Sequence, residues 1–298
     1  MQAPHVSPEF FHAVLTNTSG FRTAVSDYMN SSQHACRPAV GSQLERECQG
    51  FSDPEAVITA YDHGTLIIKL VADQLVALVR ELSPPYLSLA SWTTLRMILE
   101  SAALSSWLLD PSVDPMTRVR RSFAHRFKGL MERKGIAKSM SPDDLREAER
   151  QLNALVASAD ALGFPLLFDK KNQRNGAGER MPNSTNLVTD ILGQGQLYKI
   201  LSAFVHGHHW AYIRLSFTQT DDGTGKDATV VQRMEPFHMV GHLTFAALWL
   251  ARPVWYQSRL NGGDLPALAQ ILDRHFVDGY IEIKEEKRFW RSSVTCSG

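Results

Sequence analysis

The sequence predicts a mostly α-helical protein, an antiparallel helical bundle with one small β-hairpin. Three observations lead to this fold class. Apolar residues recur every three or four positions over long segments, as on the buried face of a helix. A capping side chain stands directly before a proline at Asp53-Pro54, Asp114-Pro115 and Ser141-Pro142, which is typical of helix starts. A short alternation with period two occurs only between about residues 212 and 232.

The apolar residues of the first 52 positions follow only a weak periodic pattern, and we expect an irregular or partly helical N-terminal segment there. Residues 53–298 form the predicted bundle domain. Proline and glycine end its helices, as at Ser83-Pro84, Asp110-Pro111 and Gly163. The predicted helices cover residues 54–82, 86–109, 115–134, 142–162, 184–192, 196–205, 236–256 and 265–277.

Two segments of the bundle domain lack a helical period. Residues 168–183 are basic and contain two glycines, so we expect a mobile loop. Residues 212–217 alternate between apolar and polar side chains, and a second β-rich run covers residues 228–231. The glycine-rich stretch between these two runs indicates a turn, which places a hairpin near residues 212–232.

Composition and charge exclude several classes of protein. The chain has 298 residues, of which 44% are hydrophobic, and 31 Lys and Arg balance 31 Asp and Glu. A net charge of zero excludes binding of nucleic acid or anionic membrane through the overall electrostatic field of the protein, although binding through a local basic surface remains an alternative. Three cysteines without Cys-x-x-Cys spacing, and an N-terminus without a signal pattern, lead us to expect a cytoplasmic protein with reduced thiols.

The most apolar segment, residues 237–256, is interrupted by His238, His242, Arg252 and Pro253. These residues are costly in hydrocarbon, so the segment is interpreted as a buried helix and no membrane partner is expected. Its apolar side chains surround nearly the whole helix. Either its own domain covers it on all sides, or a second copy of the chain does. We expect the second arrangement, a homodimer.

A candidate site lies on the helix over residues 86–109, where Arg96, Glu100 and Trp107 share one face. One interpretation is a structural ion pair at the border of the core. The other is a ligand site that contains a cation, a carboxylate and an indole. Arg96 precedes Glu100, which is the weaker order for an intrahelical pair, so either side chain is free to serve a partner on another helix.

A second group of polar residues follows Gly195. Tyr198, Ser202 and His206 fall on one side of the predicted helix, and His206 is the best candidate for a general acid or base. The helix over residues 115–134 is basic, and Arg118 and Arg121 lie at helical spacing. It is interpreted either as a solvated outer face or as a surface that meets phosphates.

Two histidines are compatible with either a metal site or a structural role. His238 and His242 lie four residues apart, which suits two imidazole ligands on one helix. Both share a face with Phe245 and Trp249, which favours hydrogen-bonded core histidines instead. Because no His-Glu-x-x-His pattern, P-loop, Gly-x-Ser-x-Gly elbow or complete dinucleotide fingerprint occurs, we expect neither a metal nor a cofactor.

Four motifs occur in an order that resembles a known group of proteins. They are LRMILESAA at residues 95–103, WLLDP at 107–111, RVRR at 118–121 and YKILSAFVHG at 198–207. This order resembles a family of uncharacterised helical bacterial proteins, notably from actinobacteria, which is distantly similar to the HEPN group. HEPN proteins are nucleotide-binding helical bundles, and several are metal-independent ribonucleases of defence and toxin systems. The resemblance implies a helical bundle that pairs as a homodimer and has RNA or a nucleotide as its ligand.

Two function classes remain open, and whether the protein is an enzyme is not decided. The first is a noncatalytic binding or sensor protein of a bacterial defence or regulatory system, with a cleft lined by Arg96, Glu100, Tyr198 and His206. The second is a metal-independent ribonuclease in which His206 moves the 2′-hydroxyl proton and Arg96 or Arg121 neutralises the phosphate. Active HEPN ribonucleases carry an arginine four to six residues before the histidine, where this chain has residues 200–202 (Ile, Leu, Ser). This difference favours the first class.

Overall fold

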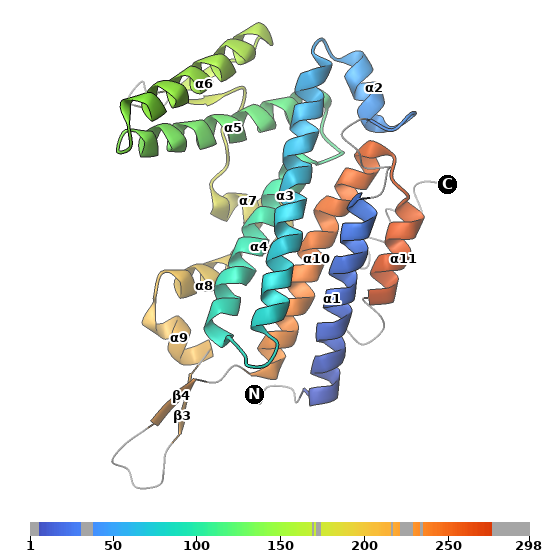
Figure 1. Cartoon of the computed structure of the whole chain (residues 1–298), viewed down its shortest axis with the longest axis vertical. Helices are drawn as coiled ribbons and strands as arrows, with labels where there is room; N and C mark the ends of the chain where they lie inside the picture. The colour runs from blue at the N-terminus through green and yellow to red at the C-terminus, as the bar shows by residue number, and fades with distance from the viewer. Residues whose placement is uncertain are drawn as a thin grey trace.

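The computed structural model describes residues 6–30, 38–168, 170, 174–215, 217–220, 229–232 and 235–275 (Figure 1). These residues form eleven helices and two separate two-stranded antiparallel sheets. The predicted fold class, mostly α with a small hairpin, is therefore confirmed.

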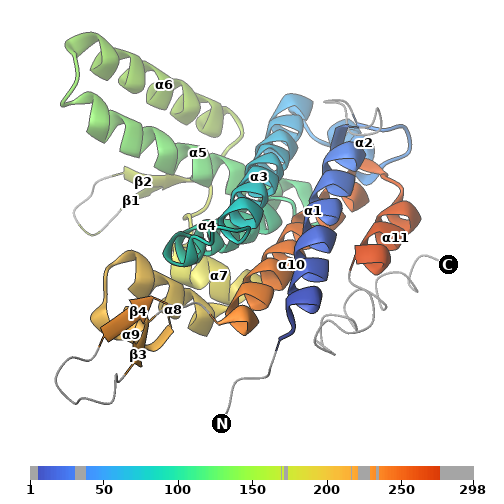
Figure 2. The same ribbon diagram turned by 60° about the horizontal axis from the view of Figure 1, so that its bottom comes forward.

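The core of the molecule is built on three long helices. α3 (Pro54–Glu81) and α4 (Ser88–Leu108) pack side by side, and α10 (Pro236–Asn261) packs against both (Figures 1 and 2). Asp53 caps α3 by accepting hydrogen bonds from the backbone N–H groups of Glu55 and Ala56. Fully buried side chains such as Leu75, Leu95 and Val254 fill the space between these helices.

A glycine sets the close approach of α3 and α4. A Cβ atom on Gly64 would lie 2.4 Å from Cγ of Leu109, so no larger residue fits there without movement. The Ser105 hydroxyl donates a 2.8 Å hydrogen bond to the carbonyl oxygen of Gly64 at the same level. This contact fixes the antiparallel register of the two helices.

The N-terminal segment is more regular than its sequence pattern indicates. Residues Pro8–Asn30 form helix α1, which packs against α3, α10 and α11 (Leu265–His275). Phe21 and Val25 are buried in the common core. Helix α2 (Gln43–Gly50) adds Leu44 to that core. Polar and small residues between the apolar positions of α1 weaken its pattern, whereas packing against three helices stabilises it.

Helices α5 (Pro115–Ala137) and α6 (Pro142–Ala161) form a pair that projects from the bundle (Figures 1 and 2). The following residues were expected to form a loop. Instead, strands β1 (Leu166–Phe168) and β2 (Arg174–Ala177) pair in an antiparallel hairpin that lies against α5. Phe164 and Ala177 are buried there, which gives this basic segment an apolar anchor.

Helices α7 (Ser184–Leu192) and α8 (Gly195–Val205) pack against α4, and Gly193 ends α7 in the left-handed conformation. The predicted hairpin is present as β3 (Phe217–Thr220) and β4 (Thr229–Gln232). Residues 212–215 were expected in its first strand and are helical instead, as part of α9 (His209–Leu215). The Tyr212 hydroxyl donates a hydrogen bond to the carbonyl oxygen of Phe204, so contact with α8 overrides the alternating pattern.

Helix α10 is covered by its own chain. Leu243, Leu250 and Trp255 are buried, and α1, α3, α4 and α11 surround the helix. Internal burial thus removes the reason for expecting dimerisation through this surface. Among the helices of the described residues, none combines the length and apolar character needed to cross a membrane.

Candidate functional site

The structure brings three of the predicted site residues together where α4 meets α8. The Arg96 Nε atom donates a 2.7 Å hydrogen bond to Oε1 of Glu100, one turn further along α4. Its Nη2 atom donates a 3.2 Å hydrogen bond to the hydroxyl of Tyr198 on α8. The guanidinium carbon also lies 5.3 Å from the centre of the Tyr198 ring. Arg96 therefore serves a partner on another helix, as the order of the pair suggested.

The Arg96 cluster is half-buried. The side chains of Arg96 and Glu100 are 17% and 32% exposed, and Tyr198 is buried. Burial lowers the pKa of Arg96, but the hydrogen bonds that Arg96 donates to Glu100 and Tyr198, together with the charge of Glu100, outweigh burial and raise that pKa above its usual value. Arg96 is thus a permanent cation with a rigid orientation.

His206 does not join this cluster in the described residues. It caps the C-terminus of α8, eight residues after Tyr198, which corresponds to about 12 Å along a helix axis. Its side chain is exposed, and its ring lies 6.5 Å from that of His208. Ser202, one turn after Tyr198, is partly exposed. Within the described residues, no hydrogen bond or ion pair joins this acid or base candidate to Arg96 or Glu100, which were expected to assist it.

Trp107 and Arg121 form a second contact, at the far end of α4. Arg121 lies 5.2 Å from the centre of the Trp107 ring and donates a 2.7 Å hydrogen bond to the Trp107 carbonyl oxygen. Its guanidinium is also 3.7 Å from the carboxylate of Asp110. Eleven residues separate Trp107 from Arg96, which is about 16 Å along the helix. Trp107 and Arg121 therefore contact each other and do not line the same site as Arg96.

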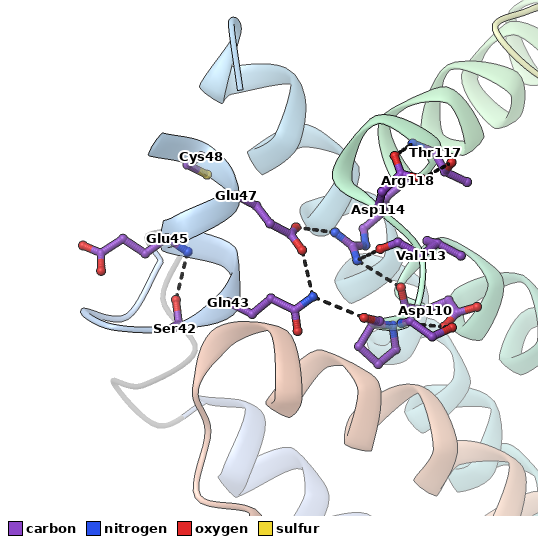
Figure 3. A network of polar contacts seen from close by, with 12 residues as sticks. Ser42, Gln43, Glu45, Glu47, Cys48, Asp110, Val113, Asp114, Thr117 and Arg118 are labelled. Atoms are coloured by element: carbon purple, nitrogen blue, oxygen red, sulfur yellow. Dashed lines mark hydrogen bonds and ion pairs between the residues drawn. The ribbon is translucent and has the colours of Figure 1, made fainter. Parts of the chain in front are cut away.

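Arg118 is part of the protein interior. Its side chain is 1% exposed and forms an ion pair with Glu47 of α2 (Figure 3). Its Nη2 atom donates 3.0 Å hydrogen bonds to the carbonyl oxygens of Asp110 and Val113. Burial lowers the pKa of Arg118, and the negative charge of Glu47 opposes that effect. Arg118 therefore joins α2 to the start of α5 and does not line an open binding surface, contrary to its predicted role.

Four other basic residues of α5 also have partners. Arg120 lies over the Phe164 ring, and Arg133 donates a hydrogen bond to Gln151. Lys128 pairs with Glu132, and Lys134 pairs with Glu149. The basic composition of this helix thus largely reflects contacts with α6 and its surroundings, as in the interpretation of a solvated amphipathic helix.

His238 and His242 border an aromatic cluster in the core. The rings of Trp92 and Phe204 stack at 4.5 Å, and the His242 ring meets Trp92 edge-on at 4.3 Å. Both His242 nitrogens are buried without a hydrogen-bond partner in the described residues. Burial lowers the pKa of His242 to about 3. His242 is a core histidine as expected, but it is not hydrogen-bonded.

Metal-ligand geometry is a separate question. In the part of the chain that the structure describes, no three His, Cys, Asp or Glu side chains are grouped in a way that suits a metal ion. The prediction that the protein contains no zinc remains a prediction, to be tested by elemental analysis of the purified protein.

Sequence reasoning missed one polar cluster, which lies between α3 and α5. The Nδ1 atom of His63 is 2.9 Å from the hydroxyl of Ser122, and the rings of His63 and His125 are 6.4 Å apart. Arg126 follows on the same side of α5. The spacing of Ser122, His125 and Arg126 was visible in the sequence, but His63 lies 59 residues before Ser122.

Comparison with known proteins adds no family to this description. No protein-family model matches the chain, and no significant match was found among the curated proteins or the solved structures.

Proposed function

We propose that this protein is a noncatalytic, distantly HEPN-like binding or sensor protein of a bacterial defence or regulatory system. Its proposed ligand is RNA or a nucleotide, bound at Arg96, Glu100 and Tyr198. The observation that carries the proposal is the assembly of these three side chains from two helices, while His206 is exposed elsewhere. A cation and a carboxylate held in place without an adjacent acid or base suit binding better than cleavage.

The unused polar atoms of the Arg96 cluster suggest how a ligand is recognised. Oε1 of Glu100 accepts from Arg96, which leaves Oε2 as a free acceptor in the described residues. Nη1 of Arg96 has no partner there and remains a donor. An acceptor beside a donor matches the edge of a nucleobase, which presents both types of group. We therefore expect base recognition at this site rather than phosphate neutralisation.

The ribonuclease remains the alternative proposal, with His206 as the acid or base and Arg96 or Arg121 as the cation. It requires His206 to move toward one of these arginines when RNA binds. In the part of the chain that the structure describes, no hydrogen bond joins His206 to either arginine, which does not favour this alternative.

Two further parts of the proposal concern the setting of the protein. A cytoplasmic location is supported by three cysteines without Cys-x-x-Cys spacing.

Homodimerisation would use the exposed side of α3 and α4, because α10 is internal. Leu66, Leu70 and Met97 are exposed there. The register set by Ser105 and Gly64 places Leu70 and Met97 at similar heights.

Fluorescence anisotropy with a short labelled single-stranded oligoribonucleotide of mixed sequence tests the binding proposal. Glu100→Gln should weaken binding by roughly tenfold, because one charged acceptor is lost. Glu147→Gln on α6 is the matched control, since it alters an exposed Glu–Arg pair of similar helical spacing. Equal effects of the two variants, or no saturable binding by the wild type, would contradict the proposal.

The same RNA, analysed on a denaturing gel, separates the two function classes. We expect it to stay intact during incubation with the wild type. Cleavage that is abolished by His206→Ala, without loss of stability, would replace the binding proposal with the ribonuclease alternative.

A further inference from the structure

A second candidate site lies where α3 meets α5, and the side chains of both helices contribute to it. Ser122, His125 and Arg126 occupy positions i, i+3 and i+4 of α5, which places them on one side of the helix. His63 of α3 reaches the same place, because its Nδ1 atom is 2.9 Å from the Ser122 hydroxyl. The structure thus collects two imidazoles, a hydroxyl and a guanidinium at one junction.

Arg126 lacks the polar partner that most cations of α5 have. Arg118, Arg121, Lys128 and Lys134 each lie beside a carboxylate, and Arg133 donates a hydrogen bond to Gln151. Arg120, like Arg126, lies against an aromatic ring. Within the described residues no carboxylate lies at ion-pair distance from Arg126, and its one defined contact is with the Phe123 ring, at 5.5 Å. Burial lowers the pKa of Arg126, and no neighbouring charge offsets this effect. A half-buried cation without a counter-charge is unfavourable, so an anion that binds beside Arg126 would be stabilised there.

The two imidazoles offer N–H donors rather than a further fixed charge. Burial lowers the pKa of His63 to about 4, and the charges of Arg126 and His125 add to this effect. Burial also lowers the pKa of His125. Both rings are therefore neutral at pH 7, and each carries one N–H donor. With Nδ1 of His63 facing Ser122, its Nε2 atom is the one left for a ligand, while Nδ1 of His125 is buried without a partner.

The charged groups around the junction do not neutralise Arg126. Asp62 precedes His63 on α3, but its pKa is raised by burial and by Glu55, and the cation that acts on it is Lys69. On α5, Lys128 and Glu132 act on His125 with opposite signs, and they pair with each other. The local charge is thus positive because of Arg126.

We propose that His63, Ser122, His125 and Arg126 form a binding site for a phosphate group, separate from the Arg96 cluster. The planar guanidinium of Arg126 offers parallel donors to two phosphate oxygens, and an imidazole N–H group can reach another. Phosphate fits better than a carboxylate, because its several oxygens match donors that come from two helices. The group is either free inorganic phosphate or the phosphate of a monoester such as a nucleoside monophosphate.

Titration of the full-length protein with inorganic phosphate and with adenosine monophosphate, followed by NMR of the histidine side chains, tests the site. We expect saturable shifts of the His63 and His125 signals. Arg126→Gln should weaken phosphate binding by roughly tenfold, because the charged guanidinium with its two parallel N–H donors is removed. Lys128→Gln is the matched control, since it removes the same charge from the exposed side of the same helix, and it should change affinity less than about twofold.

The two ligands separate the sources of the phosphate. Tighter binding of adenosine monophosphate assigns the site to a monoester, whereas equal or tighter binding of inorganic phosphate assigns it to the phosphate group alone. Absence of saturable shifts with both ligands, or equal losses in Arg126→Gln and Lys128→Gln, would overturn the proposal.

Thermal unfolding gives a second measurement that does not depend on the NMR assignment. Phosphate should raise the Tm of the wild type and of Lys128→Gln, since a ligand that binds the folded state stabilises it. It should not raise the Tm of Arg126→Gln. Without phosphate, Arg126→Gln should be at least as stable as the wild type, because the variant removes an unpaired charge. Loss of folding in this variant would therefore contradict the unpaired state of Arg126.

Discussion

At the scale of single residues, His242 makes the clearest link between burial and acid sensitivity. Its pKa is lowered from an ordinary value of 6.5 to about 3 by burial among aromatic rings. The unfolded chain therefore binds a proton that the folded protein excludes between these two pH values. The stabilising effect of the neutral form is complete above about pH 6.5 and is lost as the pH falls toward 3.

We predict that the free energy of unfolding, measured with urea, falls between pH 7 and pH 5. The slope from His242 approaches about 1.4 kcal/mol per pH unit, and His63 adds to it until about pH 4. His242→Phe should reduce this slope, because the titrating group is removed from the core. The exposed His206→Phe is the control. An unchanged slope in His242→Phe would show that His242 does not cause the acid sensitivity.

Arg118 and Glu47 are predicted to be a unit whose halves cannot be removed separately. Arg118→Met leaves the Glu47 carboxylate without its cation, which should cost about 3–5 kcal/mol of stability. Glu47→Gln in the same background should recover part of this loss. Urea unfolding of both single variants and the double variant gives the coupling energy. Simple additivity of the two losses would contradict the proposed pair.

Residue spacing on one helix was informative, and Tyr198 was correctly grouped with Arg96, but the other partners across helices were not predicted. Arg96 and Glu100 were identified as a pair because they are four residues apart. The carboxylate partner of Arg118 is 71 residues away and the imidazole partner of Ser122 is 59 residues away, and no periodic pattern links such positions. His63 was missed for this reason. His206 was singled out by its motif, but its exposure depends on where α8 ends.

At the scale of elements, two helical glycines are predicted to respond in opposite ways to alanine. Gly64→Ala would place a methyl group against Leu109 and should destabilise the α3–α4 contact by about 1–3 kcal/mol. Gly129→Ala on α5 meets open space and should stabilise the protein by up to about 1 kcal/mol. Thermal unfolding of both variants checks this pair, and a stabilising Gly64→Ala would contradict the close approach.

Local sequence signals predicted the helices well where a cap or a proline marks the boundary. The starts of α3, α5, α6 and α10 coincide with the predicted proline positions. Elements that are stabilised mainly by apolar contacts with distant parts of the sequence were missed or misassigned. Helix α1 depends on three other helices, the β1–β2 hairpin depends on α5, and α9 depends on α8. In each case tertiary packing outweighs a weak or misleading local pattern.

At the scale of the whole molecule, the apolar periodicity of the sequence predicts the helical fold, but it does not predict whether two chains associate. The apolar circumference of α10 was equally compatible with internal burial and with pairing, and the structure shows internal burial. The exposed side of α3 and α4, with Leu66, Leu70 and Met97, is the surface that we propose for a dimer. The same apolar surface of α10 can be buried by its own chain or by a second copy. Only the arrangement of the other helices around α10 distinguishes these two possibilities.

We predict that light scattering at micromolar concentration gives twice the 33.3 kDa mass of the chain. Leu70→Glu should shift the protein toward the monomer, because it places a charge within the proposed apolar contact. Ile136→Glu, on α5, is a control at another exposed apolar residue. A mass near that of one chain for the wild type would reject the homodimer.

The projection of α5 and α6 has a consequence for how the molecule opens. Helix α6 packs mainly against α5, with a smaller contact to β1, whereas α3, α4 and α10 contact one another throughout the core. Segments with few tertiary contacts exchange their amide hydrogens through partial unfolding, without opening the rest. Native-state hydrogen exchange should therefore show lower protection along α6 than along α4. Helix α6 would then behave as a separate cooperative unit, able to detach while α5 and the bundle stay folded.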